Sequence, residues 1–454
     1  MMIYQDVLNM FSKASPVTVM LRGTLENVFS AEKLDELFRN HACQQHESEL
    51  FFSTLVDLMG LAVAKVRPSV HAAYQHRKEQ MTVTVKAIYD KLNGLETDVS
   101  RALVRHTAEH LEKLIVAMKA PLPALVPGYR TKILDGSHLR RTQRRLKPLR
   151  TLNAAPLPGQ ALVVLDPSLM LVTDVFPCED AHAQERSLLW EVLLTVKPGD
   201  LWIEDRNFCT VGFVCGIHQR QAAFLVRLHG SMPYVSAGKM KRSGRCSTGV
   251  VYEEPVIVTD AEKQEHRFRH IVIYLDEPSR DGATEIHLLT NVPQRISARK
   301  LADAYRNRWT IEAAFGEITA AFHGEINTLA YPPAALFAYC LALTMYNMLS
   351  VVKAAIRTAH EVDNETLSTY YLAGEISCAY HGMMMVLPPP CWREEFGDLT
   401  IAQMASQLIA LAKKVNLDHY RKHPRGPKKP PPRKFNKKHR NHVSTKRVLE
   451  QCKT

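Results

Sequence analysis

Two aspartates stand at the ends of short apolar runs, where a carboxylate can bind a metal ion or stabilise a turn. Asp135 ends the run in KILDGS, and Asp205 ends the run in WIEDRNF. Taken alone, each aspartate also fits a structural role, because Asp-Gly pairs favour turns and aspartates after strands often cap helices. If the two runs are neighbouring strands, both carboxylates reach the edge at which open α/β sheets bind ligands.

A third acidic residue, Glu312, lies in the segment YRNRWTIEAAFGEIT, for which we expect a continuous helix. At about 100° per residue, the polar side chains of this segment fall within roughly 60° of one another on one face. That face carries Tyr305, Arg308, Glu312 and Thr319, and His323 shares it. A glutamate among these groups suits a helix that presents a metal ligand beside phosphate-binding side chains.

The chemistry that fits three carboxylates is metal-assisted phosphoryl transfer. Mg²⁺ prefers carboxylate oxygens, water and substrate phosphates. Two such ions about 3.5–4 Å apart activate the attacking oxygen and stabilise the leaving oxygen. We therefore expect two Mg²⁺ ions, with Mn²⁺ as a substitute, at Asp135, Asp205 and Glu312. Arg308 would bind a phosphate with its planar fork, and Tyr305 would add a hydrogen bond.

The elements that must position these residues change in character along the chain. Residues 1–125 have apolar residues at spacings of three and four and predict helices, and the proline-rich stretch 121–128 marks a boundary. YRTKILDGS, GQALVVLDP and LMLVTDVFP then predict three strands. A predicted helix, the strand DLWIEDR, a second helix and the strand QAAFLVRLH follow. That order matches a ribonuclease H-like architecture.

The predicted fold class is α/β. A ribonuclease H-like catalytic core with an inserted β-rich subdomain is flanked by an N-terminal helical domain and C-terminal helices. The expected units are the helical domain at 1–125, the core at 126–230 and 286–330, the insertion at 231–285, the C-terminal helical region at 331–415 and a basic tail at 416–454. From residue 419 onward the chain is poor in apolar residues, which predicts disorder in the free protein.

Three segments of the chain resemble the catalytic blocks of DDE transposases from bacterial insertion sequences, in the group with a Y-(2)-R-(3)-E-(6)-K signature. These are KILDGSHL, WIEDRNFCT and YRNRWTIEAAF, and the resemblance runs from about residue 129 to 333. Tyr305, Arg308 and Glu312 match the first three letters of the signature. The resemblance implies that the three carboxylates bind the catalytic metals. It also implies the β-rich insertion between Asp205 and Glu312.

This chain differs from the signature at its last position. The family's lysine should stand at position 319, where this chain has Thr319. In the family that lysine helps to hold a phosphate of the transposon end, so the resemblance leaves this contact unassigned. His323, one turn further along the expected helix face, is one candidate for the contact. A group from elsewhere in the chain is another.

Positive charge is concentrated in a few segments. The net charge is +12, and residues 421–447 contain twelve Lys or Arg and no acidic residue. A charge run is often only a solvated tail, but this one favours salt-dependent binding to nucleic acid. A second cluster follows Asp135 and contains Arg140, Arg141, Arg144, Arg145, Lys147 and Arg150. Its first four members are predicted to bind DNA phosphates. A third cluster, Lys239, Lys241, Arg242 and Arg245, lies in the insertion.

Two tryptophans, Trp202 and Trp309, lie near the candidate residues in sequence. An aromatic ring there can stack on an extruded base, but packing in the core is the favoured interpretation for both.

Composition excludes several classes of protein. Nine scattered cysteines without a C-x-x-C pair indicate neither a zinc ribbon nor a disulfide framework. The N-terminus lacks a signal-peptide pattern. The apolar segment at 334–352 is interrupted by polar residues and predicts a buried core helix rather than a membrane span. We therefore expect a cytoplasmic protein without a membrane partner, and the resemblance implies that it is bacterial.

The predicted function is that of an insertion-sequence transposase that excises and integrates DNA by hydrolysis and strand transfer. Its expected partners are double-stranded DNA, as terminal inverted repeats and target, and a second copy of the chain on DNA. By analogy with the family, the N-terminal helices would recognise the DNA ends. Two alternatives are a ribonuclease H-like DNA nuclease without strand transfer and a non-catalytic DNA-binding descendant of a transposase.

Overall fold

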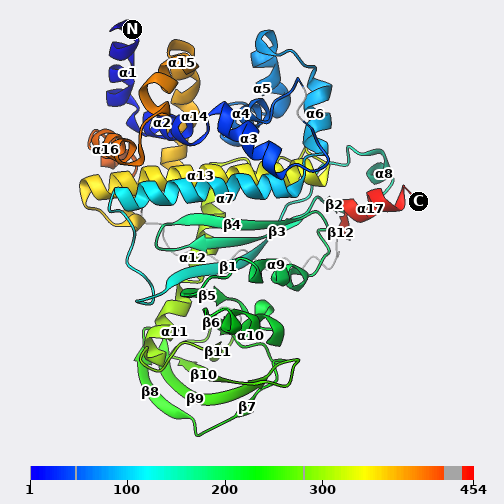
Figure 1. The fold of residues 1–454 in the computed structure, drawn as a ribbon, viewed down its shortest axis with the longest axis vertical. Coiled ribbons are helices and arrows are strands. Elements are labelled where there is room, and N and C mark those ends of the chain that lie inside the picture. Colours follow the sequence, from blue (N-terminus) through cyan, green and yellow to red (C-terminus); the bar gives the residue numbers. More distant parts are fainter. Residues whose placement is uncertain (1, 47–48, 280–281, 424–441, 454) are drawn as a thin grey trace.

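The computed structural model describes residues 2–46, 49–279, 282–423 and 442–453 (Figure 1). The N-terminal region is helical. Its helices are α1 Met2–Ala14, α2 Pro16–Val28, α3 Ala31–His41, α4 Phe52–Val63, α5 Val70–Arg77, α6 Val85–Asn93 and α7 Thr97–Ala117. Ser30, Ser69 and Thr84 cap three of them, because each hydroxyl accepts a hydrogen bond from the N–H three residues further on.

A ten-stranded sheet forms the centre of the molecule, in the order β4-β3-β1-β5-β6-β11-β10-β9-β7, with β8 paired to β9. The strands nearest the candidate site are β1 Arg130–His138, β3 Gln160–Asp166, β4 Leu171–Cys178, β5 Asp200–Glu204 and β6 Ala223–Arg227. β1, β5 and β6 are parallel to one another, whereas β3 is antiparallel to both β1 and β4. The predicted strands are therefore present, and the two aspartate strands are neighbours.

Alternate side chains of these strands enter two separate apolar clusters. Ile133 and Ile203 belong to the cluster that α7 and α13 Pro332–His360 cover. Leu134 and Trp202 belong to the cluster that contains α9 Leu189–Leu193 and α10 Val211–Gln219. Because side chains alternate along a strand, the odd-numbered positions of β1 face α13.

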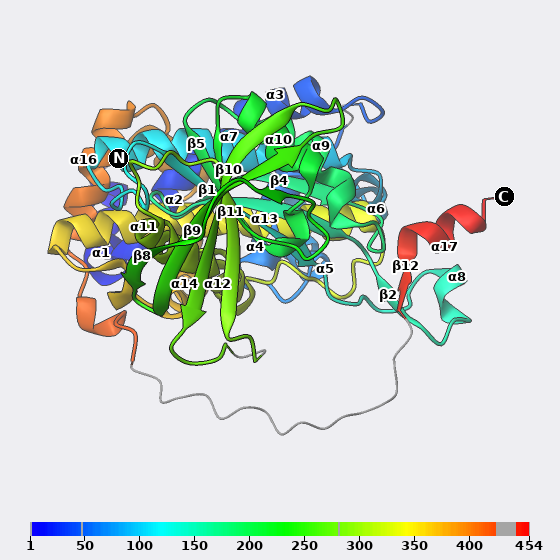
Figure 2. The same cartoon turned by 90° about the horizontal axis from the view of Figure 1, so that it is seen from below.

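The expected insertion is β-rich, and its strands continue the central sheet. β7 Val235–Ser236, β8 Lys241–Cys246, β9 Gly249–Thr259 and β10 Glu265–Leu275 are joined to the core by β11 Glu285–Thr290. β11 pairs antiparallel with both β10 and β6. In Figure 1 these strands form the green lobe below the helices, and in Figure 2, which is seen from below, they lie in front of them.

The segment that carries Glu312 differs from the expected continuous helix. It forms two helices, α11 Ala298–Arg306 and α12 Trp309–Ala321. Between them, the N–H of Arg308 donates to the carbonyl of Tyr305, a tight i to i−3 bond, at 3.0 Å. The side-chain amide of Asn307 donates to the carbonyl of Asp303 at 3.2 Å. Such local side-chain bonds compete with regular helix geometry.

Helix α13 is the core helix of the protein. Among the described residues it alone is long and apolar enough to cross a membrane, and 94% of its most apolar window is buried inside the protein. That burial agrees with the core helix predicted for 334–352. The helices α14 Thr369–Val386, α15 Pro389–Trp392 and α16 Ile401–Ala412 follow it.

The end of the basic tail is folded, which corrects the prediction of disorder from residue 419 onward. β12 His442–Ser444 pairs in parallel with β2 Ala155–Leu157, and α17 Thr445–Gln451 follows beside α8 Lys147–Arg150 (Figures 1 and 2). Ser444 and Thr445 are buried, and Arg447 forms an ion pair with Asp180 at 2.8 Å. Strand pairing and this ion pair supply the order that composition did not predict. Eight of the twelve Lys and Arg residues of 421–447 fall in 424–441, outside the described residues.

Candidate active site

Asp135 and Glu312 share one buried arginine. Nη1 of Arg308 donates to Oδ2 of Asp135 at 3.0 Å, and Nη2 donates to Oε1 of Glu312 at 3.0 Å. The Arg308 side chain is 8% exposed, that of Asp135 19% and that of Glu312 40%. The planar guanidinium thus connects β1 to α12 and fixes the relative placement of the two carboxylates.

The electrostatics of Asp135 are those of a crowded acidic site. Burial raises the pKa of Asp135 to about 6, while Arg308 and the N–H of Gly136 lower it. The charges of Glu312 and Asp205 raise the same pKa further. Glu312 and Asp205 therefore both lie close enough to Asp135 to influence its protonation.

Asp205 lies beside Asp135 because their strands are in register. Leu134 of β1 is paired with Glu204 of β5, so an aspartate follows each at the same level of the sheet. Asp205 directly follows β5, but Asp135 does not end its strand as predicted, because β1 continues to His138 in pairing with β3. By strand alternation both aspartates project to the face that also carries Ile133, towards α13. Asp205 also begins the 3-10 turn η3 Arg206–Phe208.

The adjacent acid, Glu204, is excluded from the site. Its side chain is fully buried on the opposite face, and among the described residues neither carboxylate oxygen has a hydrogen-bond partner. Burial raises its pKa well above the ordinary value. A neutral carboxyl group in an apolar cluster is not a metal ligand, so Glu204 is not a candidate for the site and Asp205 remains one.

Tyr305 and Arg227 complete the polar lining next to the carboxylates. Tyr305 is 7% exposed, and burial raises its pKa while Arg308 and Arg227 lower it and Asp205 raises it. Arg227 ends β6, the strand beside β5. Sequence reasoning missed Arg227, although a charged residue at the end of the apolar run AFLVR was a usable signal.

The two tryptophans have different environments. Trp202 is 2% exposed in the core, as favoured from the sequence. Trp309 is 61% exposed, with the guanidinium carbon of Arg308 4.9 Å from its ring centroid. Core packing was therefore the wrong interpretation for Trp309, which is an accessible aromatic surface next to the carboxylates.

Thr319 and His323 line a cavity beside the carboxylates, but they do not share one helix face. Helix α12 ends at Ala321 and Phe322 is extended, so His323 lies beyond the helix. This corrects the predicted stripe. The Thr319 hydroxyl donates to the carbonyl of Phe315 at 2.9 Å, within its own helix. Burial lowers the pKa of His323, and the charge of Lys65 lowers it further.

The cavity has a volume of about 210 Å³ and connects the end of β1 with the end of α12. Its polar lining is Ser137, Arg140, Thr319, His323, Glu325 and Tyr339. Ser137 lies two residues after Asp135 in β1. Tyr339 is 4% exposed, and its hydroxyl is buried without a hydrogen-bond partner among the described residues.

Arg140 is the one member of the second basic cluster that lines this cavity. It is exposed, and its side chain pairs with Glu325 at 3.0 Å. Arg141, Arg144 and Arg145 are exposed further along the segment that leads to α8. Arg144 and Arg145 bond within that segment, to the carbonyl of Asn153 and the side chain of Gln143.

A packed layer of polar side chains supports the far side of β1. A Cβ at Gly136 would meet the carboxylate of Glu185, which would have to move to make room for it. That carboxylate accepts a hydrogen bond from the side-chain amide of Asn207, and Arg186 donates to the Asn207 carbonyl at 2.6 Å. Glu185 was not singled out from the sequence, because no motif connects it with Asp135.

The donor set fits a divalent metal, although the side chains are not arranged as a chelate. Three carboxylates face one arginine, which leaves excess negative charge and hard oxygen donors of the kind that Mg²⁺ prefers. Among the described residues, no group of three or more His, Cys, Asp or Glu side chains has the geometry to hold a metal. Arg308 binds one oxygen of Asp135 and one of Glu312, so the guanidinium stands between two of the carboxylates.

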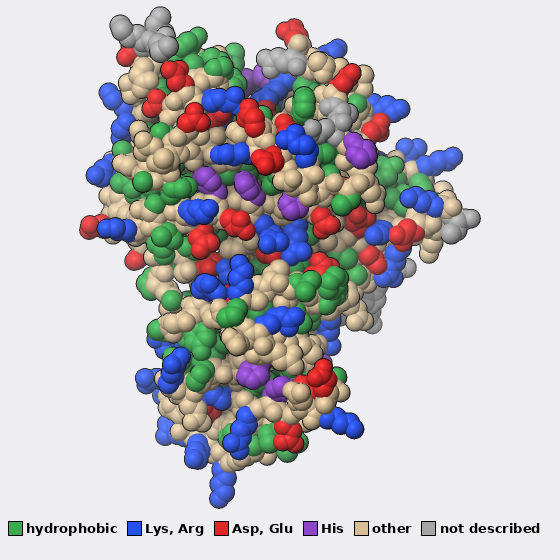
Figure 3. Space-filling view, in the orientation of Figure 1, with side chains coloured by type: hydrophobic (Ala, Val, Ile, Leu, Met, Phe, Trp, Pro, Cys, Tyr) green, Lys and Arg blue, Asp and Glu red, His purple; other side chains and the backbone are tan. Residues whose placement is uncertain are grey.

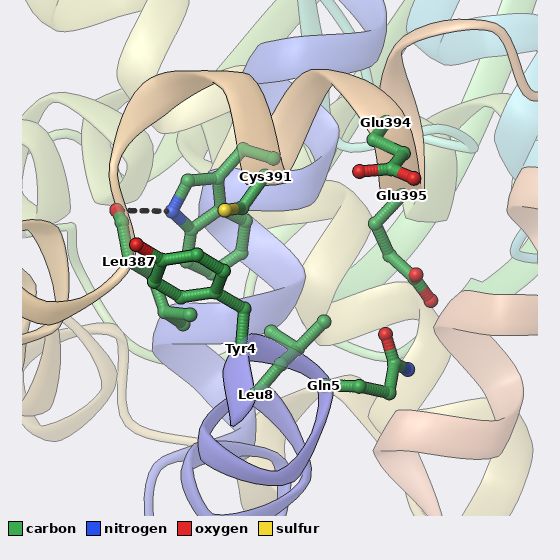
Figure 4. A pocket seen from close by; sticks show the side chains of 8 residues that line it. Tyr4, Gln5, Leu8, Leu387, Cys391, Glu394 and Glu395 are labelled. Carbon is green, nitrogen blue, oxygen red and sulfur yellow. Dashed lines mark hydrogen bonds between the residues drawn. The ribbon is translucent and has the colours of Figure 1, made fainter. Parts of the chain in front are cut away.

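A larger cavity, of about 280 Å³, lies far from these residues in the helical region (Figure 4). Tyr4 and Leu8 of α1 line it together with Trp392, Glu394 and Glu395. None of the candidate site residues contributes to it.

The central part of the chain matches a known protein family. Residues 128–348 match the family model described as Transposase DDE domain. A solved structure described as "Cryo-EM structure of piggyBac transposase synaptic complex with hairpin DNA" is similar at 10% sequence identity and a TM-score of 0.37, covering 87% of this chain and 84% of that chain. No curated protein matches the chain. The segment 128–348, which contains Asp135, Asp205 and Glu312, is thus a match to the transposase DDE domain.

Proposed function

We propose that this chain is a DNA transposase of a bacterial insertion sequence, with a catalytic metal site formed by Asp135, Asp205 and Glu312. The observation that carries the proposal is the convergence of these three carboxylates at one sheet edge, within the segment that matches the transposase DDE domain. Two of them are held by the same buried arginine.

The topology supports a ribonuclease H-like core for the proposed catalytic domain at 126–230 and 286–330. The order β4-β3-β1-β5-β6 has antiparallel strands on one side of β1 and parallel strands on the other. It places the first and fourth strands of the core side by side; Asp135 lies within the first and Asp205 directly follows the fourth.

Each protein group has a defined task in such a reaction. Divalent ions, when bound, supply Lewis-acid stabilisation of the attacking and leaving oxygens. Asp135 and Asp205 would provide ligand oxygens from the rigid sheet, and Glu312 would provide one from α12. The guanidinium of Arg308, between Asp135 and Glu312, would be placed to bind a DNA phosphate. Tyr305 lies beside Arg308.

The remaining regions would serve DNA binding. Exposed Lys and Arg side chains lie over the lower lobe formed by β7 to β10 (Figure 3). Together with Arg140, Arg141, Arg144 and Arg145, they would bind phosphates without reading sequence. We propose that the helices of 1–125 recognise the element ends and that two copies of the chain assemble on DNA.

The test is a cleavage and strand-transfer assay with Mg²⁺ on DNA taken from the inverted repeats beside the gene. Wild type is expected to nick the end and join it to target DNA. Glu312→Gln, which keeps the side-chain size, is expected to lose both steps by at least 100-fold, about 3 kcal/mol of transition-state stabilisation. Glu365→Gln, at a side chain that is 87% exposed, is the matched control and retains both steps.

The outcomes separate the alternatives. Nicking without joining would identify a nuclease, and specific binding without either step would identify a non-catalytic descendant. Equal activity of Glu312→Gln and Glu365→Gln would refute the assigned site.

A further inference from the structure

A lysine from the N-terminal helical region reaches the end of the helix that carries Glu312. Lys65 follows α4, and its Nζ donates to the carbonyl of Ala320, in the last turn of α12, at 2.7 Å. The backbone N–H of His323 donates to the carbonyl of Val63 at 2.8 Å. Two hydrogen bonds therefore dock the turn after α4 onto the end of α12.

The backbone of this turn holds Lys65 in an uncommon conformation. Its φ is +61°, in the left-handed region that non-glycine residues rarely adopt. Such conformations persist where the surrounding structure fixes them, and they cluster at functional sites. Lys65 nevertheless remains exposed, so its ammonium group is accessible to a ligand.

Lys65 and the neighbouring Arg140 have different partners. Arg140 is paired with the carboxylate of Glu325, whereas Lys65 donates to a backbone carbonyl. An ammonium group has three N–H donors, and the bond to Ala320 uses one. Its charge acts on His323, which lines the cavity beside the carboxylates.

We propose that Lys65 binds a backbone phosphate of the DNA that enters the Glu312 site. The inference rests on the proposed function and assigns one contact within it. Ala320 lies eight residues after Glu312, about 12 Å along the helix axis at ~1.5 Å per residue. That length corresponds to roughly three to four nucleotides at ~3.4 Å per step. The bound phosphate therefore lies a few nucleotides from the cut bond, and His323 donates beside it.

The placement of Lys65 also accounts for Thr319. The Thr319 hydroxyl is bonded within α12, so it brings no charge to this end of the helix. Lys65 delivers a cation to the adjacent residue, Ala320, from a segment about 250 residues away in the chain. The N-terminal helical region would thereby contribute directly to DNA binding beside the carboxylates.

The experiment measures DNA affinity against salt for the full chain in a Glu312→Gln background, which separates binding from cleavage. Each phosphate contact contributes about 0.9 to the slope of log K against log salt. Lys65→Gln is expected to reduce the slope by about 0.9, so that its loss of affinity between 50 and 200 mM salt is about 3-fold smaller than that of the parent. Lys119→Gln is the matched control, because Lys119 is also an exposed lysine with positive φ directly after a helix. It is expected to keep the parental slope.

A charge relocation provides the second arm. Adding Thr319→Lys to Lys65→Gln returns a cation to the end of α12 and is expected to restore the slope. A slope for Lys65→Gln equal to that of Lys119→Gln would overturn the proposal. So would a reduced slope that Thr319→Lys leaves unchanged, since the loss would then come from the docked turn rather than from charge. Failure of the transposase function would instead appear as absent cleavage by wild type, whatever the slopes.

Discussion

Replacing Arg308 with methionine removes the guanidinium and keeps a long side chain in the same space. The change leaves Asp135 and Glu312 facing each other without their shared cation. Removing one partner of a buried ion pair costs roughly 3–5 kcal/mol. Solvent reaches 40% of the Glu312 side chain but only 19% of that of Asp135, so most of the cost falls on Asp135. We expect a loss of about 3 kcal/mol in the free energy of unfolding, at the low end of that range.

The assay is urea unfolding at pH 8 in the presence of a chelator, monitored by circular dichroism. Arg245→Met is the matched control, because Arg245 pairs with Asp276 at 2.6 Å with 58% and 46% exposure of the two side chains. An exposed pair contributes about 0–1 kcal/mol. Arg308→Met combined with Asp135→Asn removes the orphaned charge and is expected to recover most of the loss.

Two results would refute this reasoning. A loss for Arg308→Met no larger than that for Arg245→Met would show that Arg308 does not compensate a buried charge. A double variant as unstable as Arg308→Met alone would show that the cost does not come from the charge of Asp135.

Three further predictions concern Asp135, its support and α12. Burial raises the pKa of Asp135 to about 6, so the folded chain binds a proton that the unfolded chain has released. The Asp135 carboxyl should therefore lower the free energy of unfolding by roughly 3 kcal/mol as pH rises from about 4 to 7, at ~1.4 kcal/mol per unit of pKa shift. If the free energy of unfolding, measured in urea, depends on pH in the same way for wild type and Asp135→Asn, the prediction is wrong. Gly136→Ala should displace the Glu185 carboxylate from Asn207 and reduce DNA cleavage, and Glu185→Ala should restore cleavage in the double variant; full activity of Gly136→Ala alone would show that cleavage does not depend on the position of this carboxylate. Lys353 is 5% exposed and pairs with Glu317 of α12. Lys353→Met should lower the free energy of unfolding by about 3 kcal/mol, measured by urea or heat, and the double variant with Glu317→Gln should lose about half as much. Losses of the two single variants that simply add in the double variant would contradict this.

Patterns within short stretches of sequence predicted the parts of the site that depend on residues close together in the chain. The apolar runs before Asp135 and Asp205 predicted two strands, and parallel pairing of those strands places both aspartates at one edge. The spacing from Arg308 to Glu312 is one helical turn, which accounts for the shared contacts of their side chains.

Long-range contacts account for what the sequence did not predict. Helical periodicity extended the expected stripe to His323, although Gly324 is a local signal that the helix ends before it. The contact between Lys65 and Ala320 joins segments about 250 residues apart, and no single-sequence pattern reports it. The order of 442–451 likewise depends on pairing with β2.

The predicted role of Arg308 was to bind phosphate, and the structure adds a second role. Its guanidinium already compensates Asp135 and Glu312, a contact that charge counting along the chain does not reveal. Metal or DNA binding must therefore compete with an internal ion pair, which costs desolvation and rearrangement of the same side chains.

The central claim is that Asp205 and its partners bind the catalytic metal. The most direct measurement is single-turnover cleavage of end DNA by Asp205→Cys with Mg²⁺ and with Mn²⁺, because a thiolate binds Mg²⁺ poorly and softer ions better. The account predicts at least a 100-fold loss with Mg²⁺ and recovery of tenfold or more with Mn²⁺, while wild type changes little between the two metals. Equal cleavage by Asp205→Cys and wild type with Mg²⁺ would contradict it.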